Sequence, residues 1–127
     1  MGVPIRNANK GKQMSTRATY EFNLGDKTTY CYRHHDGYPE GAAEWLKGVR
    51  TAEDFIRKNE GVEITASHDV HGDTEYRYKI TAHREGETIW VQKRLNDHHW
   101  EVIFCGSADL FQEYYGCGGS KIGINLN

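Results

Sequence analysis

The sequence predicts an α+β fold in which about six strands form an antiparallel sheet and the helices pack on one face of it. Two observations lead to this prediction. Apolar and polar residues alternate with a period of two near the start of the chain and again through its second half. Helical spacing of apolar residues is confined to segments between and after these strands. The expected order of elements is ββ-αα-ββββ-α, with grouped helices that are typical of α+β proteins.

The first two strands form a predicted hairpin. Apolar side chains alternate with polar ones from Ala18 to Leu24, which indicates a half-buried strand. Residues 25–27 (Gly-Asp-Lys) follow as a turn. Residues 28–33 are rich in β-branched and aromatic side chains and predict the returning strand.

Three helices are expected, each with its own start signal. Pro39 suits the first turn of a helix that continues to about Val49. Thr51 and Asp54 resemble a capping box that begins a second helix, which ends near Gly61. Ser107 is the expected cap of a last helix.

The second half reads as a meander of four strands between Val62 and Phe104, joined by short turns at residues 71–73, 85–87 and 96–97. Ile89 and Val91 are expected on one face of the third of these strands, with Trp90 on the other. We expect Trp100, Val102 and Phe104 to continue as the fourth strand.

Residues 1–13 are polar, contain glycine and asparagine, and predict a flexible N-terminal arm before a single α+β domain at residues 14–127. No apolar run approaches the ~18 residues that cross a bilayer, so no contact with a membrane is expected. The three cysteines, Cys31, Cys105 and Cys117, are widely spaced and predict reduced thiols in a cytoplasmic protein, with the first two packed in strands.

Histidines and carboxylates raise the question of a metal centre. The chain has seven histidines, and residues 68–73 (His-Asp-Val-His-Gly-Asp) place two of them beside two carboxylates. This segment is the expected tip of a hairpin, where both imidazoles can be solvated, so we predict no cofactor. The alternative is a metal-assisted hydrolase acting on a nucleotide or nucleic acid, which would use the histidines with Asp36, Asp69 and Asp73.

Aromatic residues favour a binding role instead. Eight tyrosines and three tryptophans exceed what a core of this size needs, and tyrosine is enriched in protein interfaces. A formal net charge of −2 argues against nucleic acid as the main partner. A nucleic-acid interface would use a mixed face with interleaved glutamates, which carries Arg77, Lys79, Trp90, Lys93 and Arg94.

Residues 14–17 (Met-Ser-Thr-Arg) and 32–41 (Tyr-Arg-His-His-Asp-Gly-Tyr-Pro-Glu-Gly) resemble a group of small uncharacterised phage and prophage proteins over roughly residues 14–50. The resemblance implies a phage or mobile-element setting and carries no reaction. In the second segment we expect Gly37 to supply a left-handed turn and Pro39 to start a helix.

Together these observations predict a phage-type protein that acts by protein–protein contact, with an inhibitor of host defence machinery (anti-CRISPR-like) as one concrete form. The expected partner is a host protein or defence complex in the host cytoplasm, and a second copy of the chain is a further candidate. An enzymatic role is the less favoured hypothesis. The candidate binding residues are Arg33, His34, His35, Asp36, Tyr38 and Glu40.

Overall fold

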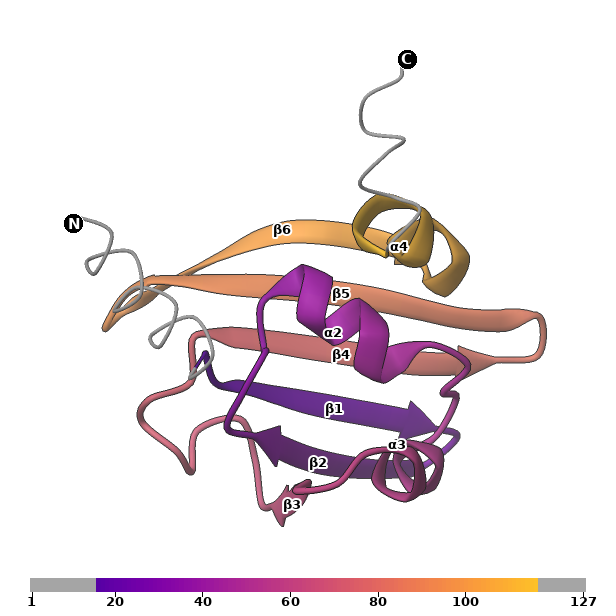
Figure 1. Cartoon of the computed structure of the whole chain (residues 1–127), viewed down its shortest axis with the longest axis horizontal. Helices are drawn as coiled ribbons and strands as arrows, with labels where there is room; N and C mark the ends of the chain where they lie inside the picture. Colours follow the sequence, from indigo (N-terminus) through magenta and orange to yellow (C-terminus); the bar gives the residue numbers. More distant parts are fainter. Residues whose placement is uncertain (1–15, 117–127) are drawn as a thin grey trace, which may run out of the picture.

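A computed structural model describes residues 16–116, which fold into a six-stranded sheet with three helices on one of its faces (Figure 1). The strand order across the sheet is β3-β2-β1-β4-β5-β6. The strands are β1 (Ala18–Leu24), β2 (Lys27–Arg33), β3 (Glu63–Thr65), β4 (Tyr76–His83), β5 (Gly86–Asn96) and β6 (His99–Ser107). The helices are α2 (Pro39–Leu46), α3 (Ala52–Lys58) and α4 (Ala108–Tyr115).

The predicted class, the six strands and the order of elements are confirmed, but the sheet is not wholly antiparallel. β1 and β4 pair in parallel, with Ala18 opposite Tyr76. The expected four-strand meander is also wrong, because β3 pairs with the outer side of β2 and only β4, β5 and β6 follow one another across the sheet. Since β2 already occupies one side of β1, β4 enters on the other side, in the same direction as β1.

The helices begin where the sequence predicts. Thr51 caps α3 by accepting a hydrogen bond from the amide of Asp54 at 3.2 Å, and Ser107 caps α4 through the amide of Leu110 at 3.0 Å. The α2 helix ends at Leu46, earlier than expected, because the chain turns through Gly48, whose φ is +73°.

The core lies between the helices and one face of the sheet. Tyr20 of β1 stacks on Tyr78 of β4 with ring centroids 4.9 Å apart, and Phe55 of α3 lies 4.7 Å from Tyr20. These three side chains are fully buried, and Phe55 contributes about 1.5–3 kcal/mol by leaving water. Burial raises the pKa of both tyrosines. Tyr32 is also buried, but on the other face of the sheet. Tyr20, Tyr32 and Tyr78 are therefore not available as contact residues.

A β-bulge in β6 changes the faces of its side chains. The pairing with β5 shifts by one residue at Ile103, between Val102, opposite Gln92, and Phe104, opposite Val91. As a result, Ile103 and Phe104 both pack against the core on the helix side. Val102 stays on the other face of the sheet, called here the open face, so the expected uniform alternation from Trp100 to Phe104 is wrong.

Residues 66–75, called here the crossing loop, join β3 at the sheet edge to β4 in the sheet interior. The loop passes over the open face, where His68 contacts Thr19 of β1 and His71 stacks on Tyr32 of β2 with centroids 3.6 Å apart. The expected hairpin tip at residues 68–73 is therefore a strap across the sheet. It leaves the open face of β5 and β6 uncovered.

The described helices are all too short and too polar to cross a bilayer. The arm predicted at residues 1–13 and the third cysteine, Cys117, lie outside the described residues.

Candidate functional site

Three segments that contain histidines lie at one end of the sheet. They are the turn after β2, with His34 and His35, the crossing loop, and the turn between β5 and β6, with His98 and His99. β2 ends at Arg33 opposite Ala18, where β1 begins, and β4 also begins there, so His34 and the crossing loop are neighbours. The turn between β5 and β6, with Asn96 opposite His99, lies at the same end (Figure 1). The topology therefore brings together the segments that the sequence singled out.

The turn after β2 serves mainly to shape the fold. Asp36, and not Gly37, adopts the left-handed conformation, with φ of +55°. Gly37 is required for close packing instead, because a Cβ there would lie 2.6 Å from the Cβ of Ala18. Its amide donates to the carbonyl of Thr16 at 3.0 Å. Gly37 is therefore required because it has no side chain, and the expectation that it supplies a left-handed turn is wrong.

Two of the predicted binding residues are part of this architecture. Arg33 is buried, lies 4.2 Å over the ring of Trp45 and donates from Nη1 to the carbonyl of Glu60 at 2.7 Å. Tyr38 is half-buried, and its hydroxyl lies 3.5 Å from Asp36 Oδ1. The guanidinium of Arg33 therefore holds α2 and the end of α3 to the sheet. The exposed side chains among the six candidates are His34, His35 and Glu40.

Glu63 of β3 joins two of the histidine segments. Its carboxylate lies 3.0 Å from His71 Nε2 and 3.9 Å from His34 Nε2. The ring of Tyr32 lies between them, and its hydroxyl donates to Asp73 at 2.8 Å. Burial and this contact raise the pKa of Tyr32 to about 12. These contacts hold the crossing loop against β2 and β3. Each polar group of the cluster has a protein partner.

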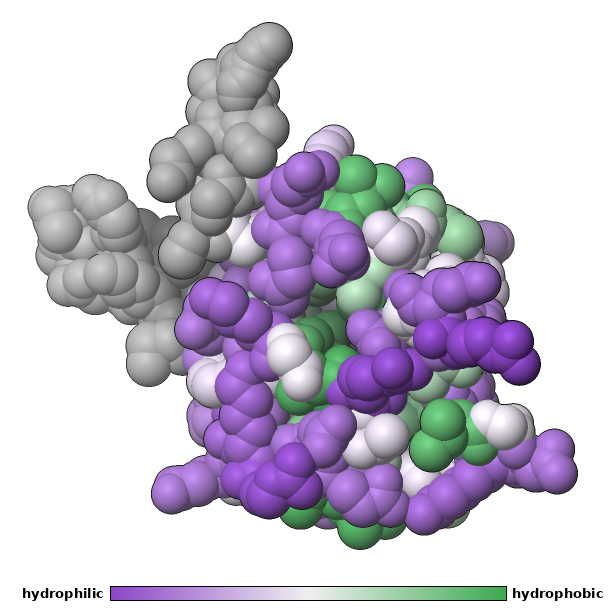
Figure 2. All heavy atoms as spheres, turned by 90° about the vertical axis from the view of Figure 1, so that its right-hand side faces the viewer, coloured by the Kyte–Doolittle hydropathy of each residue, from purple (hydrophilic) through white to green (hydrophobic). Residues whose placement is uncertain are grey.

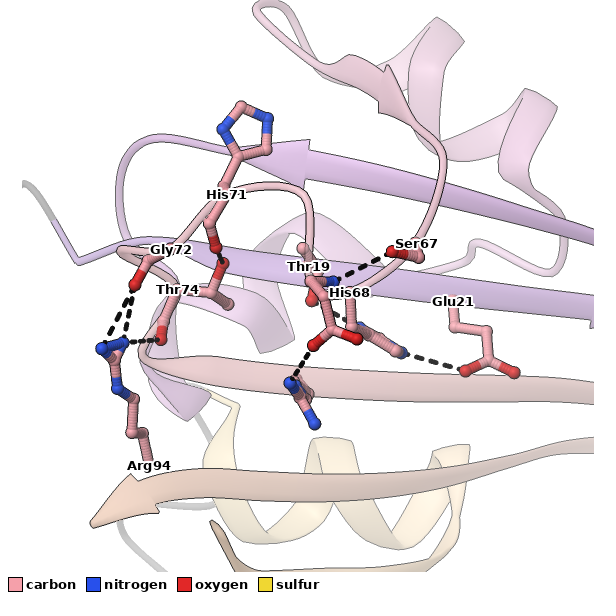
Figure 3. Close-up of polar contacts among 10 residues, drawn as sticks. Thr19, Glu21, Ser67, His68, His71, Gly72, Thr74 and Arg94 are labelled. Carbon is pink, nitrogen blue, oxygen red and sulfur yellow. Dashed lines mark hydrogen bonds and ion pairs between the residues drawn. The ribbon is translucent and has the colours of Figure 1, made fainter. Parts of the chain in front are cut away.

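A hydroxyl, an imidazole and a carboxylate line up beneath the crossing loop, as Figure 3 shows. His68 Nδ1 lies 2.5 Å from Thr19 Oγ1, and its Nε2 lies 2.9 Å from Glu21 Oε1. A neutral imidazole has one N–H, so it donates to the carboxylate and accepts from the threonine. This order resembles a nucleophile with its base.

However, Thr19 is fully buried, so no substrate carbonyl can approach its hydroxyl. Burial also lowers the pKa of His68, an effect that the contact with Glu21 only partly offsets. The arrangement thus anchors the crossing loop to β1. Sequence analysis did not single out Thr19 and Glu21. The only sequence signal for them is that they alternate with the apolar residues of β1 and so lie on its polar face.

The carboxylates required by the hydrolase hypothesis are used in other contacts. Asp69 pairs with Arg77 at 2.7 Å, and Asp73 pairs with Arg17 at 2.9 Å. Arg94 donates to the Gly72 carbonyl at 2.9 Å and borders a polar hollow of about 300 Å³ beneath the loop. Within residues 16–116, no three His, Cys, Asp or Glu side chains converge in a way that could hold a metal ion.

The uncovered part of the open face carries a patch, called here the Trp patch, made of Lys79, Trp90, Trp100 and Val102. Trp90 is 37% exposed and Val102 is 48% exposed. The ammonium of Lys79 lies 5.5 Å from the ring centre of Trp90, and the guanidinium of Arg77 lies 3.9 Å from that of Trp100. Sequence analysis placed Arg77, Lys79 and Trp90 together, but it missed Trp100 and Val102 because the bulge was not foreseen.

The remaining predicted members of a basic face separate. Lys93 lies opposite Tyr76 and so points to the helix side, whereas Arg94 lies opposite Trp100 on the open face. Cys31 is buried on the helix side, and Cys105, expected to be packed, is exposed on the open face opposite Trp90. The two thiols are free, and burial raises the pKa of Cys31 to about 11.

The end of the molecule opposite the histidine turns is mainly hydrophilic, with small apolar areas separated by polar residues (Figure 2). A hollow of about 220 Å³ at the turn between β4 and β5 is lined by polar groups that include His83 and Glu85. The neighbouring Glu87 is paired with Arg50 at 2.6 Å. This end therefore offers neither a continuous apolar surface nor a group of converging catalytic side chains.

Comparison of the chain with protein-family models, with curated proteins and with solved structures gave no significant match.

Proposed function

We propose that this chain is a phage-type binding protein that acts by protein–protein contact with a host protein or defence complex, without catalysing a reaction. The observation that supports this most is the Trp patch. It places the exposed indole of Trp90 on a rigid sheet, and tryptophan is enriched in interface hot spots.

The charges on this face favour a protein over a nucleic acid. Arg77 is paired with Asp69, and Arg94 donates to the carbonyls of Gly72 and Thr74. These cations hold the crossing loop, so they do not form the continuous positive track that phosphates require. The net charge of −2 points the same way.

The hydrolase alternative receives less support from the geometry. The Thr19 hydroxyl is inaccessible, and Asp69 and Asp73 are committed to arginines. The exposed residues His34 and His35 in the turn after β2, together with Glu40 at the start of α2, extend the candidate contact surface at the histidine end of the sheet. A partner seated on the Trp patch and reaching this end would contact both.

The test is capture of partners from host extract by the tagged protein, followed by binding of the purified partner. Trp90→Ala is expected to weaken that binding by about 30-fold or more, as for a hot spot of 2 kcal/mol. Leu24→Ala is the matched control, because Leu24 is an exposed apolar residue at the other end of the sheet.

Equal binding by Trp90→Ala and the control would remove the Trp patch from the proposal. Binding of single-stranded nucleic acid that weakens steeply with salt, with no protein partner captured, would contradict the protein-binding role itself.

A further inference from the structure

The two edges of the sheet are unequal. β3, at one edge, has three residues, whereas β6, at the other, has nine. Natural edge strands are commonly protected by short length, lysine, proline or a bulge. β6 is nine residues long and contains neither lysine nor proline; its protective features are the bulge at Ile103 and the carboxylate of Glu101. β6 is the last strand in the order of the described sheet, so its outer backbone groups have no ladder partner among residues 16–116.

Apolar side chains flank this edge on both faces. On the open face lies the Trp patch with Val102. On the helix side, Leu110 and Tyr114 of α4 are 45% and 62% exposed, and Tyr114 packs against Phe104 of β6 with centroids 6.2 Å apart. An edge with unpaired backbone groups between two apolar borders is suited to accept another strand.

We propose that β6 pairs antiparallel with β6 of a second copy of this chain, which joins the two sheets edge to edge. The bulge determines the register. Before it, Trp100 and Val102 face the open side; after it, Cys105 and Ser107 do. A continuous sheet requires residues of the same face to lie opposite each other.

One register satisfies that requirement along the whole strand. It places Trp100 opposite Ser107 of the second copy, Val102 opposite Cys105, and Ile103 opposite Phe104, with the two-fold axis at the bulge. A slip by one residue puts Val102 opposite Phe104 or Gly106, which face the helices. A slip by two residues brings Val102 opposite Ile103 in one direction and Phe104 opposite Cys105 in the other. Each of these pairs sets a side chain of the open face against one of the helix side.

The charges agree with this register and with a second copy as the occupant. Glu101 falls opposite Gly106 of the second copy, so the two acidic side chains do not meet. A self-complementary strand is what an isologous dimer requires.

The inference does not depend on a host partner, but it adds to the proposed function because it brings two Trp patches onto one continuous open face. Each patch borders β6, so both would lie beside the axis. A partner could then engage two identical sets of tryptophans at once.

The first test is the mass of the full chain by sedimentation equilibrium over a range of micromolar concentrations. The expected result is a species of twice 14.6 kDa. Val102→Lys, at an exposed position, is expected to give a monomer that keeps the circular dichroism spectrum of the wild type, and Leu24→Lys is the control that remains dimeric.

The second test uses disulfide formation in a Cys117→Ser background. Residues directly opposite each other on antiparallel strands have Cβ atoms about 4.5–5.5 Å apart, which allows a bridge with small adjustment. Val102→Cys is therefore expected to form a covalent dimer through the native Cys105, and Cys105→Ser is expected to abolish it. Leu24→Cys should give no covalent dimer.

A wild-type chain that stays monomeric across this concentration range would overturn the proposal. Crosslinking by Val102→Cys that persists without Cys105 would overturn the register. A dimer that captures no host protein would leave this inference intact and count against the proposed function, so the two failures can be told apart.

Discussion

Replacing Gly37 with alanine tests whether the turn after β2 is an architectural element. The new Cβ would lie 2.6 Å from the Cβ of Ala18 and 3.0 Å from both the amide nitrogen of Ala18 and the carbonyl oxygen of Thr16. Two of these three atoms belong to the backbone, so the turn has to move away from β1. That movement also strains the hydrogen bond from the Gly37 amide to Thr16.

Overpacking of this kind costs about 1–3 kcal/mol. We therefore expect Gly37→Ala to lower the free energy of unfolding by that amount in urea, followed by circular dichroism, with an unchanged denaturant slope. Gly72→Ala is the control, because a Cβ at Gly72 meets no atom within 4 Å. A difference between the two variants below about 0.5 kcal/mol, the usual range for surface substitutions, would refute the packing argument.

Three further predictions concern buried groups. Burial lowers the pKa of His68 below 6.5, so the unfolded state binds more protons than the folded state and the free energy of unfolding should fall as the pH drops through 6.5. His68→Asn should reduce this loss of stability, whereas the control His98→Asn should not. Urea unfolding at pH 7.5 and 5.5 measures the difference. In a Cys117→Ser chain, a thiol reagent should label Cys105 in the native protein and Cys31 only after unfolding. Arg33→Lys should lower the free energy of unfolding by about 1–2 kcal/mol in the same assay, because lysine loses the planar stacking on the indole and the aimed hydrogen bond; an unchanged midpoint would contradict this role.

Local signals predicted the elements well. The caps at Thr51 and Ser107 and the helix start at Pro39 depend on neighbours within a few residues, and the structure has each of them. Alternation likewise identified the buried face of β1, which includes Tyr20.

Pairings between distant strands could not be predicted in this way. Alternation indicates that a segment is a strand but not which strand lies beside it, so β3 was expected next to β4 and the parallel contact of β1 with β4 was missed. The bulge at Ile103 adds one residue without any glycine or proline signal in β6 before it.

The candidate site shows the same limit. Turn chemistry indicated a bend at residues 34–41, but the burial of Arg33 against Trp45 and of Gly37 against Ala18 depends on elements elsewhere in the chain. The anchoring of His68 to β1 is equally non-local.

The parallel contact between β1 and β4 also constrains how the chain can fold. β1 can form a hairpin with β2 as soon as both have been synthesised, but its other side must wait for a strand that begins at Tyr76, after two helices and the crossing loop. Closing so long a segment is slow compared with forming a hairpin. Until β4 docks, the backbone groups on that side of β1, beside Tyr20 and Phe22, have no ladder partner.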